Sequence, residues 1–95
     1  MASARSETSI DDERIRVTAW TFGARDQDTG FHTHEYDYIV VPVTGGTFTV
    51  TAQDETSREM TQRAGVPYPG KAGTAHNVIY SGEEPAVFVE IELKQ

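Results

Sequence analysis

Short segments rich in β-branched and aromatic residues alternate with turn-forming clusters along most of this chain. Apolar and polar residues alternate over 14–19 and over 47–52 (TFTVTA), and 86–93 carries one apolar face, which is the two-residue repeat of a strand. Trp20 and Phe22 continue the first of these strands on the face of Arg16, so that strand could be covered on both sides. Tyr, Ile and Val crowd the stretch 36–43, and these residues also favour a strand. No stretch of the sequence repeats with a helical period. The pattern predicts an all-β fold of short strands, either a barrel or a sandwich.

Turn-forming clusters and two weaker strands complete this pattern. Gly, Asp, Ser, Thr and Pro gather in five turns or loops: 26–30, 44–46, 54–56, 65–73 and 81–85. The stretch 44–46 (TGG) predicts a hairpin turn between the strands on either side of it. The weaker strands are expected over 57–63 and 74–80.

The last predicted strand carries one clean apolar face. Val87, Val89 and Ile91 alternate with Glu90 and Glu92, so the two sets lie on opposite faces of the strand. We expect the aliphatic residues to face the core and the glutamates to be solvated. If the opposite face looks inward, Glu90 could act as a general base.

The length of 95 residues allows one domain. The polar stretch 1–12 is expected to be a flexible end, which leaves 13–95 as the domain. The sequence has no cysteine, so no disulfide can stabilise this small core. A bound metal ion or association with a second copy would add stability.

An excess of acidic residues limits the partners this chain can have. Fifteen acidic residues against eight basic ones give a formal net charge of −7. That charge argues against nucleic acid, whose phosphates are neutralised by Lys and Arg, and against an anionic membrane surface. No apolar run is long enough to span a bilayer, and the N-terminus has no signal-peptide pattern. We therefore expect a cytoplasmic protein that acts on a small molecule.

The three histidines are the most informative residues of the sequence. His32 and His34 are two residues apart, so in a strand their side chains point to the same face. His76 lies on another predicted strand, which antiparallel folding could bring opposite this pair. Imidazole is a strong ligand for Zn, Fe, Ni and Cu. The spacing therefore makes these three residues candidate ligands of one divalent metal ion.

The sequence around the first two histidines, HTHEYDYIVVPVTGG, closes on Gly45. It resembles the first motif of the cupin family, in which a His-x-His is followed by a Glu and then by a Gly. The second cupin motif resembles GVPYPGKAGTAHNVIY, where Gly65, Gly73 and His76 match at the expected spacing. Lys71 stands where that motif has Pro, and Tyr80 where it has Asn.

The resemblance covers roughly residues 30–80. It implies a single jelly-roll barrel of short antiparallel strands, with the metal ion inside the barrel and commonly a homodimer. Fe(II) is the ion that we expect, while Ni, Mn and Zn are alternatives with the same ligands.

Tyr38 stands where the first cupin motif has its glutamate. By strand parity its side chain points the same way as the histidines, whereas Glu35 and Asp37 point away. The predicted site is thus three neutral imidazoles, which leave the charge of the ion uncompensated and favour anionic chelating ligands. Tyr38 either assists the chemistry as a hydrogen-bond donor or acid–base group, or fills the barrel as a packed aromatic residue.

Four further residues are candidates for the substrate pocket: Tyr36, Tyr80, Gln62 and Met60. Three-histidine iron sites among cupins resemble those of thiol dioxygenases and diketone-cleaving dioxygenases. The predicted function is accordingly a metalloenzyme, dioxygenase-like or an isomerase or lyase, which acts on a small anionic chelating substrate. The alternative is a cupin without catalytic activity that binds or senses a small molecule. A relative with an empty site is a third, lesser reading.

Overall fold

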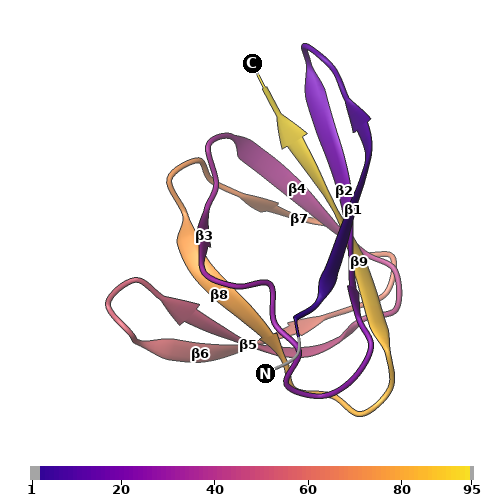
Figure 1. Ribbon diagram of the computed structural model, residues 1–95, viewed down its shortest axis with the longest axis vertical. Coiled ribbons are helices and arrows are strands. Elements are labelled where there is room, and N and C mark those ends of the chain that lie inside the picture. The colour runs from indigo at the N-terminus through magenta and orange to yellow at the C-terminus, as the bar shows by residue number, and fades with distance from the viewer. Residues whose placement is uncertain (1–2, 95) are drawn as a thin grey trace.

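Two antiparallel sheets form the structure, as the strand pattern predicts (Figure 1). The computed structural model describes residues 3–94. The strands within this range are β1 Arg5–Asp11, β2 Ile15–Phe22, β3 His32–Thr33, β4 Asp37–Pro42, β5 Gly46–Ala52, β6 Ser57–Gln62, β7 Tyr68–Gly70, β8 Ala75–Tyr80 and β9 Ala86–Leu93. One sheet has the order β1-β2-β9-β4-β7 and the other the order β3-β8-β5-β6.

An aromatic cluster fills one end of the space between the sheets. Phe22, Phe48 and Phe88 are almost fully buried, and their ring centroids lie 5.2–5.7 Å apart. Tyr80 joins them with 4% of its surface exposed, and its hydroxyl donates a hydrogen bond to the carbonyl of Glu84. Burying such rings is the main favourable contribution to folding in a domain of this size.

The inward face of β9 differs from the expected one. Phe88, Glu90 and Glu92 are buried, whereas Val87 and Val89 are half-buried on the outer face. The prediction that the aliphatic residues look inward and the glutamates are solvated is therefore wrong. The glutamates are tolerated inside because β2, paired with β9, supplies partners for both of them.

The turn at 44–46 is not a hairpin turn. β4 pairs with β7 and β9, whereas β5 pairs with β6 and β8 in the other sheet. The backbone N–H groups of Val43 and Thr44 both bond to the carbonyl of Val87 before the chain crosses over. Gly45 and Gly46 have φ angles of 80° and 134°, a backbone conformation that favours glycine and lets the chain leave its sheet.

Two segments without a strand signal are strands in the structure. Residues 5–11, expected to be a loose end, pair with β2 as β1 although every one of them is exposed. Residues 68–70 interrupt the predicted loop as β7, an edge strand that pairs with β4. Pro69 fits there because an edge strand does not need every N–H. Within residues 3–94 no helix is long and apolar enough to cross a membrane.

Candidate metal centre

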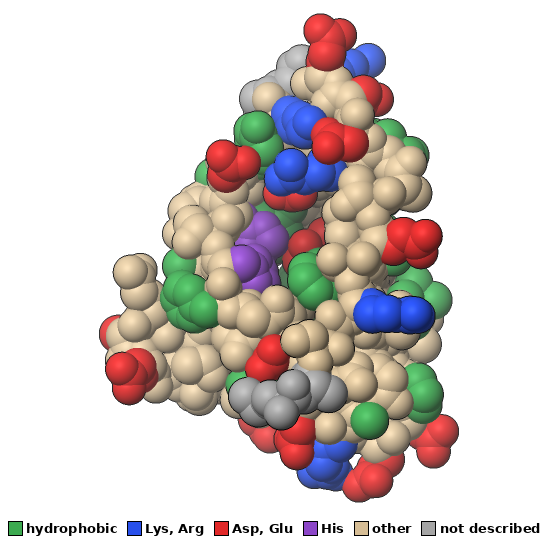
Figure 2. Space-filling model, in the orientation of Figure 1, with side chains coloured by type: hydrophobic (Ala, Val, Ile, Leu, Met, Phe, Trp, Pro, Cys, Tyr) green, Lys and Arg blue, Asp and Glu red, His purple; other side chains and the backbone are tan. Residues whose placement is uncertain are grey.

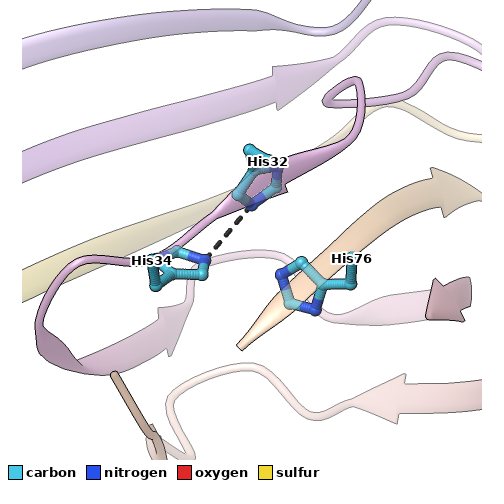
Figure 3. Close-up of side chains that lie close together, drawn as sticks. All are labelled: His32, His34 and His76. Atoms are coloured by element: carbon cyan, nitrogen blue, oxygen red, sulfur yellow. Dashed lines mark hydrogen bonds between the residues drawn. The ribbon is translucent and has the colours of Figure 1, made fainter. Parts of the chain in front are cut away.

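The pairing of β3 with β8 places His32 directly opposite His76 (Figure 3). His34 follows β3, and its backbone N–H donates to the carbonyl of Thr74, which keeps the chain beside β8. The side chains of His32 and His34 consequently turn to the same side, toward His76. The prediction that the three histidines come together is confirmed.

The histidine nitrogens lie close enough to share one ion. One candidate ligand atom from each residue falls within 4.8 Å of the other two. The Nε2 atoms of His32 and His34 are 3.2 Å apart. Nδ1 of His32 lies 2.9 Å from the carbonyl oxygen of Gly30. Because a carbonyl only accepts hydrogen bonds, it fixes the proton on Nδ1 and leaves the Nε2 lone pair directed at the cluster.

Burial keeps two of the imidazoles neutral. Desolvation, reinforced by the nearby His32, lowers the pKa of His34 to about 4, and the same causes lower the pKa of His76 to about 4. The neutral imidazole is the form that binds metals. Nε2 of His76 is buried and has no hydrogen-bond partner among the described residues. An orphaned buried nitrogen in a cluster of neutral imidazoles fits a metal ligand.

Tyr38 lies against the cluster, as strand parity predicts. Its ring stacks on the imidazole of His34 with the ring centroids 3.9 Å apart and the planes at 19°. Burial raises the pKa of the phenol, so it is protonated at neutral pH. On the other side the ring packs on Gly70, where an added Cβ would lie 2.0 Å from Cζ of Tyr38.

Glu90 is the site residue that the sequence analysis placed wrongly. It is 7% exposed, its Oε2 lies 3.8 Å from Nε2 of His34, and its Oε1 accepts a hydrogen bond from Nε1 of Trp20 at 3.2 Å. Burial raises the pKa of this carboxyl to about 7. The sequence of β9 alone does not reveal this, because the partners come from β2: Arg16 lies opposite Glu92, and Trp20 reaches Glu90 diagonally from its place opposite Phe88.

A cavity of about 390 Å³ opens beside the histidines. Its lining combines apolar walls with the polar side chains of Tyr38, Arg58, Tyr68, His76 and Glu90. Figure 2 shows that the histidines are visible from one face of the molecule, recessed between the surrounding side chains. The space can admit a small molecule that contacts the cluster.

Of the four predicted pocket residues, only Met60 lines this cavity. Gln62 borders a neighbouring one and donates a hydrogen bond to the hydroxyl of Tyr68 at 2.9 Å. Tyr80 belongs to the aromatic cluster at the other end of the sandwich. Tyr36 lies under the guanidinium of Arg16, because the chain bends at 35–36 and interrupts the strand repeat. The expectation that Tyr36, Tyr80 and Gln62 line the pocket is therefore corrected.

Known proteins resemble this chain over nearly its whole length. The β-alanine degradation protein BauB of Pseudomonas aeruginosa is 42% identical over 85 residues, which cover 90% of this chain and 87% of the relative. The crystal structure of a cupin domain from Bordetella pertussis Tohama I has 38% identity and a TM-score of 0.93, with 99% and 96% of the two chains covered.

A more distant structure shows the fold alone. An RmlC-like cupin with a double-stranded β-helix fold from Methanocaldococcus jannaschii has 11% identity and a TM-score of 0.77, over 98% of this chain and 82% of the other. No protein-family model matches the chain. The two antiparallel sheets, the clustered histidines and the full-length similarity to the Bordetella domain agree, and we conclude that this chain belongs to the cupin family.

Proposed function

We propose that this chain is a metal-dependent cupin enzyme in which His32, His34 and His76 hold one divalent ion. The observation that carries the proposal is the set of three imidazoles whose candidate ligand atoms lie within 4.8 Å of one another. Fe(II) is the preferred ion, and Ni, Mn and Zn accept the same nitrogen ligands. The orphaned Nε2 of His76 supports a ligand role for that residue, because a structural histidine would have a hydrogen-bond partner.

The proposed substrate is a small organic anion with two oxygen or sulfur atoms that can chelate the ion. Neutral imidazoles do not compensate the charge of a divalent ion, so an anionic ligand gains electrostatically on binding. Arg58 lines the cavity and can attract a carboxylate. The name of the relative BauB connects it with β-alanine, and this supports a short carboxylate, substituted at the third carbon, as the substrate class.

The proposed chemistry is that of a dioxygenase, or of an isomerase or lyase. When bound, the ion supplies Lewis acidity or a place for O₂. The protein residues have separate tasks. The carbonyl of Gly30 holds the proton on Nδ1 of His32, and the protonated phenol of Tyr38 can donate a hydrogen bond into the cavity.

Metal analysis of protein purified without a histidine tag tests the ligand assignment. We expect about one divalent ion per chain after reconstitution with Fe(II), and its loss in His76→Ala. Thr33→Ala is the matched control, because Thr33 is an exposed residue of β3 between the two first histidines and should leave metal content unchanged. Full metal content in His76→Ala would contradict the assignment.

A second experiment tests turnover. Oxygen uptake and product formation are measured with a panel of candidate substrates. The panel contains C3 carboxylates with an amino, hydroxy or oxo group, together with thiols and diketones. We expect at least one of them to be consumed by the Fe(II)-loaded protein and not by His76→Ala. Binding without consumption of any compound would refute the enzyme proposal and favour a cupin that only binds its ligand.

A further inference from the structure

Glu90 projects from the inward face of β9 toward the histidines. Its side chain is buried, and its two oxygens have different surroundings. Oε1 accepts the hydrogen bond from the indole of Trp20 at 3.2 Å. Oε2 points the other way and lies 3.8 Å from Nε2 of His34, the nitrogen that faces His32. The indole thus holds the carboxylate with one oxygen directed at the candidate metal site.

The carboxylate of Glu90 lacks a cationic partner. Glu92, two residues along the same face, is paired with the guanidinium of Arg16 through two contacts of 2.6 and 3.0 Å. Among residues 3–94 no lysine or arginine forms an ion pair with Glu90, and its one basic neighbour is the neutral imidazole of His34. A buried carboxylate without a counter-charge is costly. A divalent ion at the histidines would supply that charge.

We infer that Glu90 is a fourth protein ligand of this ion, which it binds through Oε2. The inference rests on the proposed metal site. Two ligand atoms, each about 2.0–2.2 Å from one ion, can lie up to about 4.4 Å apart. The 3.8 Å between Oε2 of Glu90 and Nε2 of His34 satisfies this limit, as does the 3.2 Å between the Nε2 atoms of His32 and His34. The widest separation within the histidine set is 4.8 Å, so ion binding requires a shift of a few tenths of an ångström in that set.

The register of the sheet explains how a different strand supplies the carboxylate. Tyr38 of β4 occupies the motif position of the glutamate, and its inward neighbours across the ladder are residues of β9. Val40 pairs with Glu90, and Tyr38 pairs with Glu92. Glu92 is held by Arg16, so Glu90, whose Oε2 lies 3.8 Å from Nε2 of His34, is the carboxylate of β9 that faces the histidines. The carboxylate of Glu90 would then neutralise one of the two positive charges of the ion. The single remaining charge suits a chelating monoanion better than a dianion.

Zn²⁺ affinity, measured by competition with a chromophoric chelator, tests the inference. Outer-shell residues of metal sites typically change affinity by about 10–100-fold, so loss of a direct ligand in Glu90→Gln should exceed about 100-fold. Glu92→Gln is the matched control, because it removes the same charge from the same face of β9, and it should stay within about tenfold. The visible spectrum of the Co²⁺-loaded protein should also change in Glu90→Gln and not in Glu92→Gln.

Glu90→Asp separates ligation from charge. It keeps the negative charge and withdraws the oxygen by one methylene, so a direct ligand loses affinity and a purely Coulombic role does not. A loss below about 100-fold in Glu90→Gln, or an unchanged affinity in Glu90→Asp, would overturn the assignment. If the wild-type chain and His76→Ala bind Zn²⁺ equally, the three-histidine site itself fails. If His76→Ala alone loses the ion, that site stands and only the role of Glu90 is refuted.

Discussion

Gly70 is the position at which one added methyl group should disturb both stability and the metal site. A Cβ there would lie 2.0 Å from Cζ of Tyr38 and 2.3 and 2.5 Å from its Cε atoms, where real contacts essentially never fall below 3.0 Å. The backbone of Gly70 does not have a positive φ angle, so alanine causes no backbone strain. The whole effect of Gly70→Ala must come from the clash with the Tyr38 ring.

The ring has little room to retreat. It would have to move by roughly 1 Å or more to restore a tolerable contact, and the imidazole of His34 lies on its other side with 3.9 Å between ring centroids. Overpacking of a filled core costs about 1–3 kcal/mol, and a site confined on both sides belongs in the upper half of that range. A loss of about 2 kcal/mol lowers the Tm of a domain of this size by roughly 8–16 °C.

Urea denaturation of the metal-free protein measures this loss, with Gly23→Ala as the control. At Gly23 the nearest atom to an added Cβ is 3.5 Å away, so stability should change by less than about 0.5 kcal/mol. In a Tyr38→Leu background the clash is relieved, and Gly70→Ala should then cost at least about 1 kcal/mol less than it does alone. A wild-type free energy of unfolding for Gly70→Ala would refute the reasoning.

Three other predictions concern the ion, a partly buried ion pair and the outer face of a sheet. A free-ion concentration of 100 times its Kd should raise the free energy of unfolding by about 2.7 kcal/mol. Removal of the ion with a chelator should therefore lower Tm by roughly 10–20 °C in the wild type and not in His76→Ala. In urea denaturation, Arg16→Leu should lower the free energy of unfolding by about 2 kcal/mol, because it leaves the buried carboxylate of Glu92 without its partner. Arg25→Leu, at the exposed pair with Glu83, should lower it by less than about 1 kcal/mol. Equal effects of the two substitutions would contradict this. We also propose that a homodimer interface is formed by the half-buried outer residues of β2, β9 and β4: Val17, Ala19, Ile39, Val41, Val89 and Ile91. Light scattering should report a dimer for the wild type and a monomer for Val89→Lys. A monomeric wild type would exclude this interface.

The histidine cluster could be predicted because it depends on local geometry. His32 and His34 share a face by the two-residue repeat, antiparallel folding could bring His76 opposite them, and the resemblance to the cupin motifs favoured that arrangement. The all-β class followed from the same repeat. The inward direction of Tyr38 also follows from parity, although the bend at 35–36 removed Tyr36 from the same face.

The inward face of β9 could not be chosen from its own sequence. One face of that strand is wholly apolar and the other only half apolar, so hydropathy favoured Val87, Val89 and Ile91 for the core. The decision depends on β2, where Trp20 and Arg16 satisfy Glu90 and Glu92. Strand β1 was not predicted for a related reason: its seven residues are exposed, and main-chain pairing with β2 holds it in place. Pairing with another strand leaves no trace in the pattern of a single strand.

Tyr38 and Glu90 divide between them what one motif glutamate would do, and Tyr38→Phe tests the division. The ring of Tyr38 covers a face of His34 and fixes its orientation by stacking, while Glu90 brings the negative charge from the neighbouring strand. Phenylalanine keeps the ring and its fit on Gly70, so Zn²⁺ affinity should stay within about threefold of wild type, well under the roughly 10–100-fold typical of lost outer-shell partners. If the phenol donates a proton or a hydrogen bond, turnover of the substrate should fall while the Kd for the metal stays unchanged. An affinity loss above about tenfold in Tyr38→Phe would mean that the hydroxyl, rather than the ring, serves the ion.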